Sequence, residues 1–350
     1  MLQLLIPLSI LSSPAFVRAQ TLVMASALAA QYTLTTSTAF PFPSATLAPT
    51  DTVNHIVSQW SLGKGHIQDG ESDVAFVQNP FPNSPPISSS DPATSGNSTV
   101  LQVTYPQGSF SQGTGGTQFY NLWNTTDGST FGSMLLSYEM AFDSNFTWVK
   151  GGKLPGLRGG LDGTGCSGGD SVPNGVECFS SRVMWRKFAE GEVYAYIPTP
   201  NGLCKDKDVI CNSDFGTSFN RGGFGFLPGQ WLRISMLVQM NNPPNIANGQ
   251  IQLYYNDRLA ISQTGLQLRS ADSLSINGLY FSTFFGGSDS SWATPTNQHT
   301  YFRNIQMWGS SAVSNLTGDP VQSSGFITTP TPLISLLFLS SVYLWILSFL

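Results

Sequence analysis

Apolar and polar residues alternate through most of the middle of the chain, in runs separated by glycine, proline and other turn residues. Alternation with a period of two is typical of strands with one buried face, and no stretch shows a sustained helical period. Strands without intervening helices predict an all-β fold, a single-domain β-sandwich of the jelly-roll type. The clearest runs lie at residues 133–142, 181–188, 192–198, 230–240, 250–256 and 279–285.

Two of these runs predict a hairpin whose turn contains Ala189, Glu190 and Gly191. A three-residue loop needs a left-handed third residue, which suits Gly191. The resulting register sets Arg186 opposite Tyr194 and Met184 opposite Tyr196. One face is then apolar and is predicted to face the core, whereas the other is not. The apolar face consists of Val183, Trp185, Val193, Ala195 and Ile197, and the other of Ser180, Arg182, Met184, Arg186, Tyr194 and Tyr196.

Both ends of the chain are apolar. Residues 1–19 end in Val17-Arg18-Ala19 and predict a signal peptide, with Ala25-Ser26-Ala27 as an alternative cleavage site. Residues 326–350 carry no charge and predict a signal that is removed when a glycosylphosphatidylinositol anchor is attached, with Ser323 as the attachment residue. A retained membrane tail is the alternative. We therefore expect an extracellular protein, anchored at the cell surface or wall.

Between the two ends the composition changes twice. Residues 20–54 are rich in Ser, Thr and Pro and predict a poorly ordered lead-in, and residues 310–325 predict a stalk. The sandwich is expected to span residues 55–309, and the chain to act as a monomer.

Four cysteines fit an exported protein, since an oxidising compartment favours disulfides. Closeness in sequence favours pairing Cys166 with Cys178 and Cys204 with Cys211, although two other pairings exist. Zinc is disfavoured because no histidine lies near them. Four glycosylation sequons point to the same route: Asn97, Asn124, Asn145 and Asn315.

Charge is sparse, with 15 Lys and Arg against 20 Asp and Glu and a net charge of −5. This balance argues against a nucleic-acid partner, which requires a basic surface. The basic residues are nevertheless concentrated, which predicts an anion-binding region. Six fall within 38 positions: Lys150, Lys153, Arg158, Arg182, Arg186 and Lys187.

The segment GGKLPG, then Ser-x-Arg, then Tyr-x-Tyr resembles polysaccharide lyases of the alginate and glucuronan lyase type, family 14 and its relatives. The likeness covers about residues 130–308, including a C-terminal stretch at 282–308. It implies a jelly-roll enzyme that cleaves uronic-acid polymers by β-elimination. The insertion at 161–179 lengthens the spacing between the first two motifs. The residues that the resemblance places in the active cleft are Lys153, Ser180, Arg182, Tyr194 and Tyr196.

The chemistry suits these residue types. Arginine grips a carboxylate with a planar fork, so Arg182 is expected to neutralise the uronate, and Ser180 to position it or relay a proton. Lys153 and one of the two tyrosines are expected to act as base and acid, in either order. Lys150, Arg186 and His299 are expected to contact neighbouring sugars. No cofactor is expected, and a structural calcium is left open.

Other chemistries find less support. No Gly-x-Ser-x-Gly elbow of a serine hydrolase is present. The paired carboxylates of a glycosidase could be Glu190 and Glu192, but their place beside the turn predicts solvated side chains. His55 and His66 lack metal-ligand partners. The rival functions are a non-catalytic protein that binds acidic carbohydrate at the cell wall or surface, and an adhesion protein.

Overall fold

The computed structural model describes residues 21–87, 99–160, 166–168 and 173–322. The predicted signal peptide at 1–19, the anchor signal at 326–350, Asn97 and Ser323 lie outside the described residues. Within those residues, no helix is long and apolar enough to cross a membrane.

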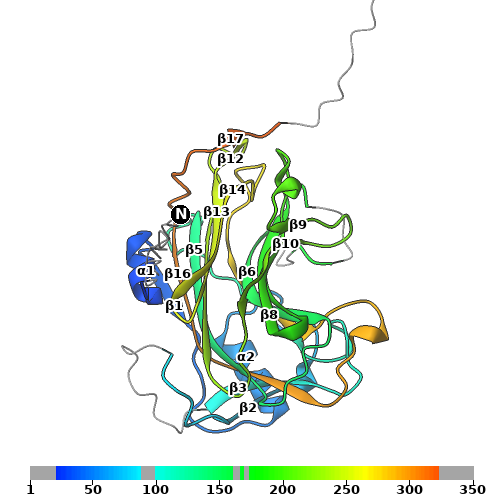
Figure 1. Ribbon diagram of the computed structural model, residues 1–350. Helices are drawn as coiled ribbons and strands as arrows, with labels where there is room; N and C mark the ends of the chain where they lie inside the picture. The colour runs from blue at the N-terminus through cyan, green and yellow to red at the C-terminus, as the bar shows by residue number, and fades with distance from the viewer. Residues whose placement is uncertain (1–20, 88–98, 161–165, 169–172, 323–350) are drawn as a thin grey trace, which may run out of the picture.

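Two antiparallel sheets face each other (Figure 1). The eight-stranded sheet has the order β14-β13-β11-β5-β16-β3-β2, with β1 also paired to β16. Its strands are β1 Thr36–Ala39, β2 Val74–Gln78, β3 Thr99–Tyr105, β5 Ser133–Phe142, β11 Leu232–Gln239, β13 Gly249–Tyr255, β14 Arg258–Leu266 and β16 Gln298–Ser310.

The seven-stranded sheet has the order β4-β15-β6-β7-β8-β10-β9, and a short pair, β12-β17, closes one end of the molecule. The strands of the seven-stranded sheet are β4 Thr117–Tyr120, β6 Gly151–Gly160, β7 Cys178–Arg186, β8 Glu190–Tyr196, β9 Val209–Ile210, β10 Thr217–Gly225 and β15 Gly278–Phe285. The end pair is β12 Ile246–Ala247 and β17 Asp319–Pro320. The predicted all-β sandwich of the jelly-roll type is confirmed.

The core lies between the sheets and is rich in aromatic rings. Trp185 on β7 contacts Tyr105 on β3 and Phe142 on β5, with ring centroids 6.0 and 5.9 Å apart. All three rings are fully buried. Because each strand sends alternate side chains to opposite faces, this core also decides which residues of the seven-stranded sheet point away from it.

The predicted register of the β7–β8 hairpin is wrong. The turn is the short 3₁₀ segment η2, Lys187–Ala189, where Phe188 and Ala189 take left-handed φ angles of 64° and 66°. Gly191 lies inside β8 instead, opposite Trp185. Arg182 pairs with Tyr194, and Ser180 with Tyr196.

The predicted faces are nevertheless correct, because the register differs by an even number of residues. A shift of one residue would exchange the faces, whereas an even shift preserves them. The apolar set is fully or almost fully buried in the main core: Val183, Trp185, Val193, Ala195 and Ile197.

The expectation of a poorly ordered lead-in is also wrong. Residues 20–54 contain α1, Ala25–Gln31, and β1, and most of α2, Pro49–Gln59. Leu28 of α1 packs against Leu135 and Leu237 on the outer face of the eight-stranded sheet. Ile56 of α2 is buried in the main core. The alanines of α1 hid a helix because small residues produce little hydrophobic periodicity. The predicted stalk likewise contains β17, which pairs with β12.

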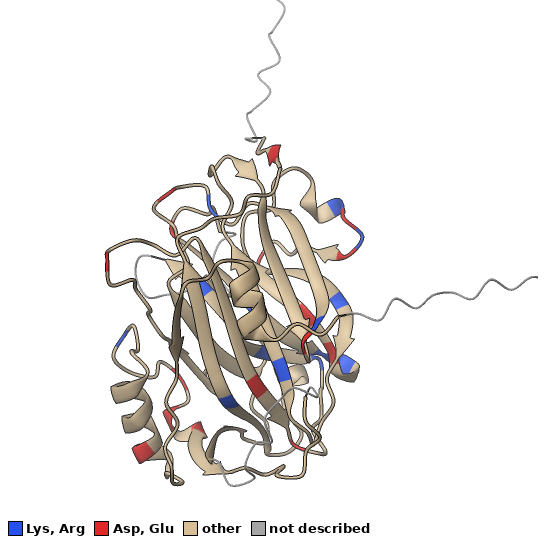
Figure 2. Cartoon of the chain, turned by 90° about the vertical axis from the view of Figure 1, so that its left-hand side faces the viewer, with Lys and Arg blue, Asp and Glu red and all other residues tan. Residues whose placement is uncertain are grey.

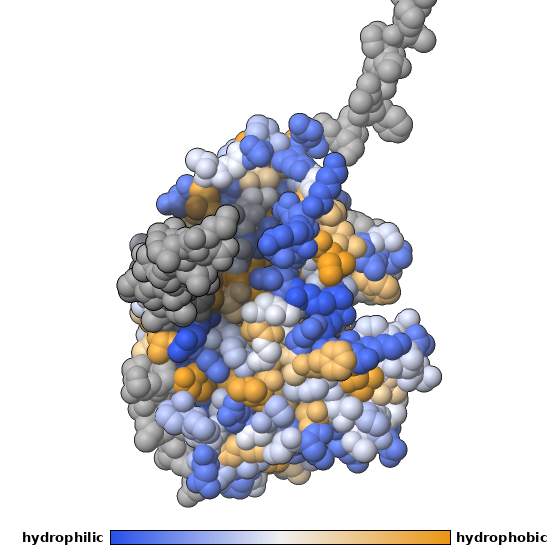
Figure 3. All heavy atoms as spheres, viewed as in Figure 1, coloured by the Kyte–Doolittle hydropathy of each residue, from blue (hydrophilic) through white to orange (hydrophobic). Residues whose placement is uncertain are grey.

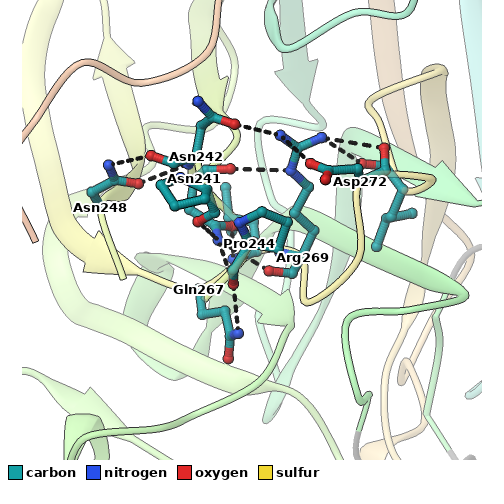
Figure 4. A network of polar contacts seen from close by, with 10 residues as sticks. Asn241, Asn242, Pro244, Asn248, Gln267, Arg269 and Asp272 are labelled. Carbon is teal, nitrogen blue, oxygen red and sulfur yellow. Dashed lines mark hydrogen bonds and ion pairs between the residues drawn. The ribbon is translucent and has the colours of Figure 1, made fainter. Parts of the chain in front are cut away.

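Polar side chains fasten the loops beside β12 (Figure 4). The Asn241 side chain accepts from the backbone N–H groups of Leu268 and Arg269, both at 2.9 Å, and donates to the Pro244 carbonyl. The Arg269 guanidinium donates in return to the Asn241 carbonyl at 3.0 Å. Buried loop backbone therefore finds its partners in side chains at this end of the sandwich.

Charged residues also occur on the outer face of the eight-stranded sheet, where Figure 2 shows acidic and basic positions side by side on neighbouring strands. Glu139 accepts from Arg233 at 2.9 Å and from Arg303 at 2.7 Å, and Arg233 also pairs with Asp257. These charges compensate one another, in contrast to those on the opposite sheet.

Candidate active site

A cleft of about 650 Å³ lies on the face of the seven-stranded sheet that is turned away from the core. Its floor comes from β6, β7, β8 and β10. Loops on opposite sides form its walls, and Figure 3 shows a notch in the surface between them, at the right-hand side. One wall contains Ser167, Gly168, Ile210, Asn212, Phe215 and Gly216, and the other Ser111, Gln112, Phe284, Gly286, Gly287, Ser288 and Trp292.

Lys153 rises from β6 into this floor. It lies between Met184 on β7 and Phe284 on β15 in the strand register. Its Nζ atom lies 3.5 Å from the centre of the Tyr194 ring and 2.8 Å from the Met184 sulfur. Burial, and then the positive charges of Arg182 and Arg186, hold the pKa of Lys153 well below its ordinary value, and Glu192 opposes this only in part. Its amine is thereby prepared to act as a base.

Arg182, on β7, is almost fully buried in the floor, with an exposed fraction of 1%. Its Nη1 atom donates to the Ser282 hydroxyl at 3.0 Å, and the guanidinium lies 4.3 Å from the centre of the Tyr280 ring. The Nε and Nη2 atoms have no hydrogen-bond partner among the described residues. Two unpaired donors on one buried, planar cation form a site for the two oxygens of a carboxylate.

A chain of hydrogen bonds fixes the position of Arg182. The Ser282 hydroxyl donates to Gln118 Oε1 at 3.3 Å, and the Tyr280 hydroxyl donates to the same oxygen at 3.0 Å. Gln118 Nε2 in turn donates to Asp69 at 3.3 Å. The guanidinium is therefore held through Nη1, while its buried Nε and Nη2 atoms have no partner among the described residues.

Tyr194 and Tyr196 lie beside each other on β8, with ring centroids 5.7 Å apart. Burial raises the pKa of both hydroxyls, so both keep their protons at neutral pH. Arg186 opposes the rise in the pKa of Tyr194 and Arg182 opposes the rise in the pKa of Tyr196, but the rise is the larger for Tyr194. Tyr196 is therefore the better placed of the two to give up a proton.

Glu192 is not the solvated turn residue that the sequence predicted. It is fully buried on β8, and its two oxygens accept from different partners. Oε1 accepts from Arg186 Nε at 2.7 Å, and Oε2 accepts from the Ser218 hydroxyl at 2.6 Å and from Arg221 Nε at 2.8 Å. The shifted turn explains the error, since it places Glu192 two positions inside the strand.

Ser180 does not line the cleft. Its hydroxyl is buried and donates to the Cys166 carbonyl at 2.7 Å, so it supports the wall that carries Ser167 and Gly168. The predicted proton relay through Ser180 is therefore not supported by its position. Ser180 does lie on the cleft face of β7, as the resemblance implies, but Cys166 from the inserted segment packs on its hydroxyl.

His299 is also misplaced by the sequence argument. It lies on β16 of the eight-stranded sheet, where its ring pairs with Asp143 at 2.9 Å.

The other predicted basic residues lie in different places. Arg186 lines the cleft, where it is paired with Glu192. Lys150 is exposed behind one wall and donates to Ser291, next to Trp292. Arg158 is buried beside Tyr120, with its Nη1 donating to Asn277.

The two disulfides predicted from sequence closeness are confirmed as Cys166–Cys178 and Cys204–Cys211. Both fasten the same side of the cleft. The first ties the segment with Gly168 to β7, and the second closes the loop that precedes Asn212. Within the described ranges, no group of three or more His, Cys, Asp or Glu side chains could hold a metal ion.

The cleft residues that the sequence did not reveal include Arg221, Phe215 and Trp292. Trp292 lies within the C-terminal stretch that carries the resemblance, which was a usable signal. Arg221 and Phe215 lie in and before β10, where no motif marks them.

Comparisons with known proteins agree with this geometry. The family model for polysaccharide lyase 14 matches residues 93–305. A PL-14 alginate lyase from Aplysia kurodai is 31% identical, with a TM-score of 0.62, over 77% of this chain and 100% of that one. The alginate lyase vAL-1 from Chlorella virus shares the fold at 22% identity and a TM-score of 0.53, over 76% and 99% of the two chains. A comparison with curated protein sequences found no match. Because the family match contains every strand of the seven-stranded sheet, and with them the cleft floor, this chain belongs to polysaccharide lyase family 14.

Proposed function

We propose that the chain is an extracellular lyase that cleaves (1,4)-linked uronic-acid polymers, glucuronan or alginate, by β-elimination. The observation that carries this proposal is the pair of unpaired donors on Arg182, in the same cleft as the buried amine of Lys153. The Aplysia kurodai relative, which is an alginate lyase, supports the same substrate class.

Arg182 neutralises the carboxylate of the sugar that reacts. Its Nε and Nη2 atoms donate to the two carboxylate oxygens, which draws electron density away from C5. The proton on C5 becomes more acidic because the enolate-like charge of the transition state lies beside a fixed cation in a site largely shielded from water. The rigid support from Ser282 and Gln118 means that little reorganisation is needed as this charge develops.

Lys153 removes the C5 proton with its neutral amine. The electron pair of the C5–H bond forms the C4–C5 double bond, and the C4–O4 bond breaks. Tyr196 donates its proton to the departing O4, so that one product carries a new hydroxyl and the other an unsaturated ring. The proton on Lys153 then returns to Tyr196 through solvent. Tyr194, whose ring lies 3.5 Å from Lys153 Nζ, orients the base.

An extracellular location is part of this proposal. Asn124, Asn145 and Asn315 are all exposed, as glycosylation requires, and both cysteine pairs are oxidised. In a eukaryotic secretory host, treatment with an N-glycosidase should lower the mass of the protein, and a phosphatidylinositol-specific phospholipase should release it from membranes. An N-terminal segment that is not cleaved, together with membrane attachment that the phospholipase does not release, would contradict the proposal.

The central test is to incubate the purified chain with alginate and with glucuronan, and to follow the ultraviolet absorbance of the unsaturated product. We expect absorbance to rise with at least one polymer, and mass spectrometry to show products without added water. Binding of both polymers without any product would instead identify a non-catalytic carbohydrate-binding protein.

A further inference from the structure

The floor of the cleft continues past the reacting centre, toward β10. Glu192 there holds two arginines at once, one from β7 and one from β10. A buried carboxylate is stable only when it is well paired, and Glu192 is paired on both oxygens. Two arginines against one carboxylate leave one positive charge in excess. Among the described residues that line the cleft, none is an Asp or a Glu, so within this part of the chain the excess positive charge is not compensated at the cleft surface.

Arg221 is the more available of the two arginines. It donates to Glu192 through Nε, and its side chain keeps an exposed fraction of 36%, against 13% for Arg186. Its terminal Nη1 and Nη2 atoms have no hydrogen bond to any described residue. A guanidinium that is held by one edge and open at the other can still bind a carboxylate.

An irregularity in β10 turns Arg221 toward the cleft. Phe219 pairs with Val193 on β8, but the next pair joins Phe224 to Gly191, so β10 carries extra residues between them. Asn220 and Gly222 take left-handed φ angles of 50° and 79° within this bulge. Bulges redirect side chains in this way beside functional sites.

Arg221 and Arg182 differ in position along the sheet as well as in strand. Arg182 lies opposite Tyr194, whereas Arg221 lies in the bulge of β10 and binds Glu192, two residues before Tyr194. β7 and β10 are also separated by β8, about 10 Å at the usual strand spacing. A polymer with one carboxylate on every sugar presents a separate carboxylate to each arginine.

We infer that Arg221, held by Glu192, which also accepts from Ser218 and Arg186, is a second carboxylate-binding site, which binds a uronate next to the one that reacts. This inference rests on the proposed function for the identity of the polymer. It predicts that the enzyme requires acidic groups beyond the reacting sugar.

The kinetic test compares Arg221→Ala with the unchanged chain on the cleaved polymer. We expect KM to rise about tenfold with kcat nearly unchanged. The charge-assisted hydrogen bond to the neighbouring uronate is present both in the bound substrate and in the transition state, so its loss weakens binding without raising the barrier to the reaction. Arg221→Lys, which keeps the charge but loses the fork, should fall between the two. Arg258→Ala is the matched control, since Arg258 is exposed on β14 of the other sheet. A KM equal to that of the unchanged chain would overturn the inference.

Binding separates this inference from the proposed function. In the Lys153→Ala background, calorimetry with uronate oligosaccharides should show about tenfold weaker affinity when Arg221→Ala is added. The same oligosaccharides with their carboxyl groups reduced to alcohols should show no dependence on Arg221. An equal loss for the acidic and the reduced ligands would refute carboxylate recognition. A chain that binds in this pattern but never cleaves would disprove the lyase proposal alone.

Discussion

The Nζ atom of Lys153 lies 3.5 Å from the centre of the Tyr194 ring. The two residues come from strands that are not neighbours, since β7 lies between β6 and β8. Their contact shows that the cleft-facing side chains of three strands converge on one point. It also buries the amine between a ring, a thioether and two arginines, which is the environment that a lysine base requires.

Replacement of Lys153 by alanine should reduce kcat by about 10²–10⁴-fold, the usual contribution of a general base. The free energy of unfolding should not fall, because a buried amine is removed. Lys187→Ala provides the control, since Lys187 is exposed at the β7–β8 turn. Product absorbance measures the rate, and circular dichroism checks the fold. Retention of activity within a few fold would exclude Lys153 as the base.

The lowered pKa of Lys153 predicts the direction of the pH dependence. As pH falls through that pKa the amine becomes protonated and kcat/KM should decrease, whereas the enzyme should stay active at neutral pH. The charged groups that set this pKa are Arg182 and Arg186 on β7 and Glu192 on β8. Bound uronates add negative charge, so the acid limb of kcat should lie at higher pH than that of kcat/KM. Activity that appears only near pH 10 would contradict this.

The same shift links the base to stability. Lys153 binds its proton more weakly when folded, so the unfolded chain binds more protons between the two pKa values, and stability rises with pH across that window. Each unit of lowering costs about 1.4 kcal/mol at a pH below both values. Lys153→Met should therefore raise the melting temperature at neutral pH, and the gain should shrink as pH approaches 10.5. Thermal unfolding at several pH values measures it, and a lower melting temperature at neutral pH would refute it.

The two tyrosines should differ in their effects. Tyr196→Phe removes the proposed acid and should lower kcat by about 10²-fold or more. Tyr194→Phe keeps the ring beneath Lys153 and should cost less. A polymer with a better leaving group at O4 should rescue Tyr196→Phe but not Lys153→Ala. An equal loss of kcat in the two phenylalanine variants would contradict the assignment of Tyr196 as the acid.

Glu192 is expected to act as a positioning residue. Glu192→Gln removes the negative charge that raises the pKa of Lys153, so the acid limb of kcat/KM should move to lower pH. It also breaks a buried ion pair, which should cost about 3 kcal/mol of stability. Glu190→Gln is the matched control, because Glu190 is exposed two positions earlier. A lower rate without any movement of the limb would mean that Glu192 is only structural.

Much of the fold followed from the alternation of apolar and polar residues. The faces of β7 and β8 were predictable because a period of two assigns each side chain to a face. An error in the register by an even number of residues does not change that assignment. The helices were not predictable, because α1 is mostly alanine and α2 buries only Thr52 and Ile56. Closeness in sequence was enough for the disulfides, since both close short loops.

The sequence by itself determined which side chains face away from the core, and, through three motifs, that Lys153, Arg182 and Tyr196 belong together. Only the tertiary structure decided the surroundings of each group. Glu192 is buried because Arg186 and Arg221 reach it from two strands, Ser180 is covered by the segment at Cys166, and His299 lies on the other sheet. Burial and pairing depend on residues far apart in the chain, and it is these contacts, rather than residue type, that set charge and pKa.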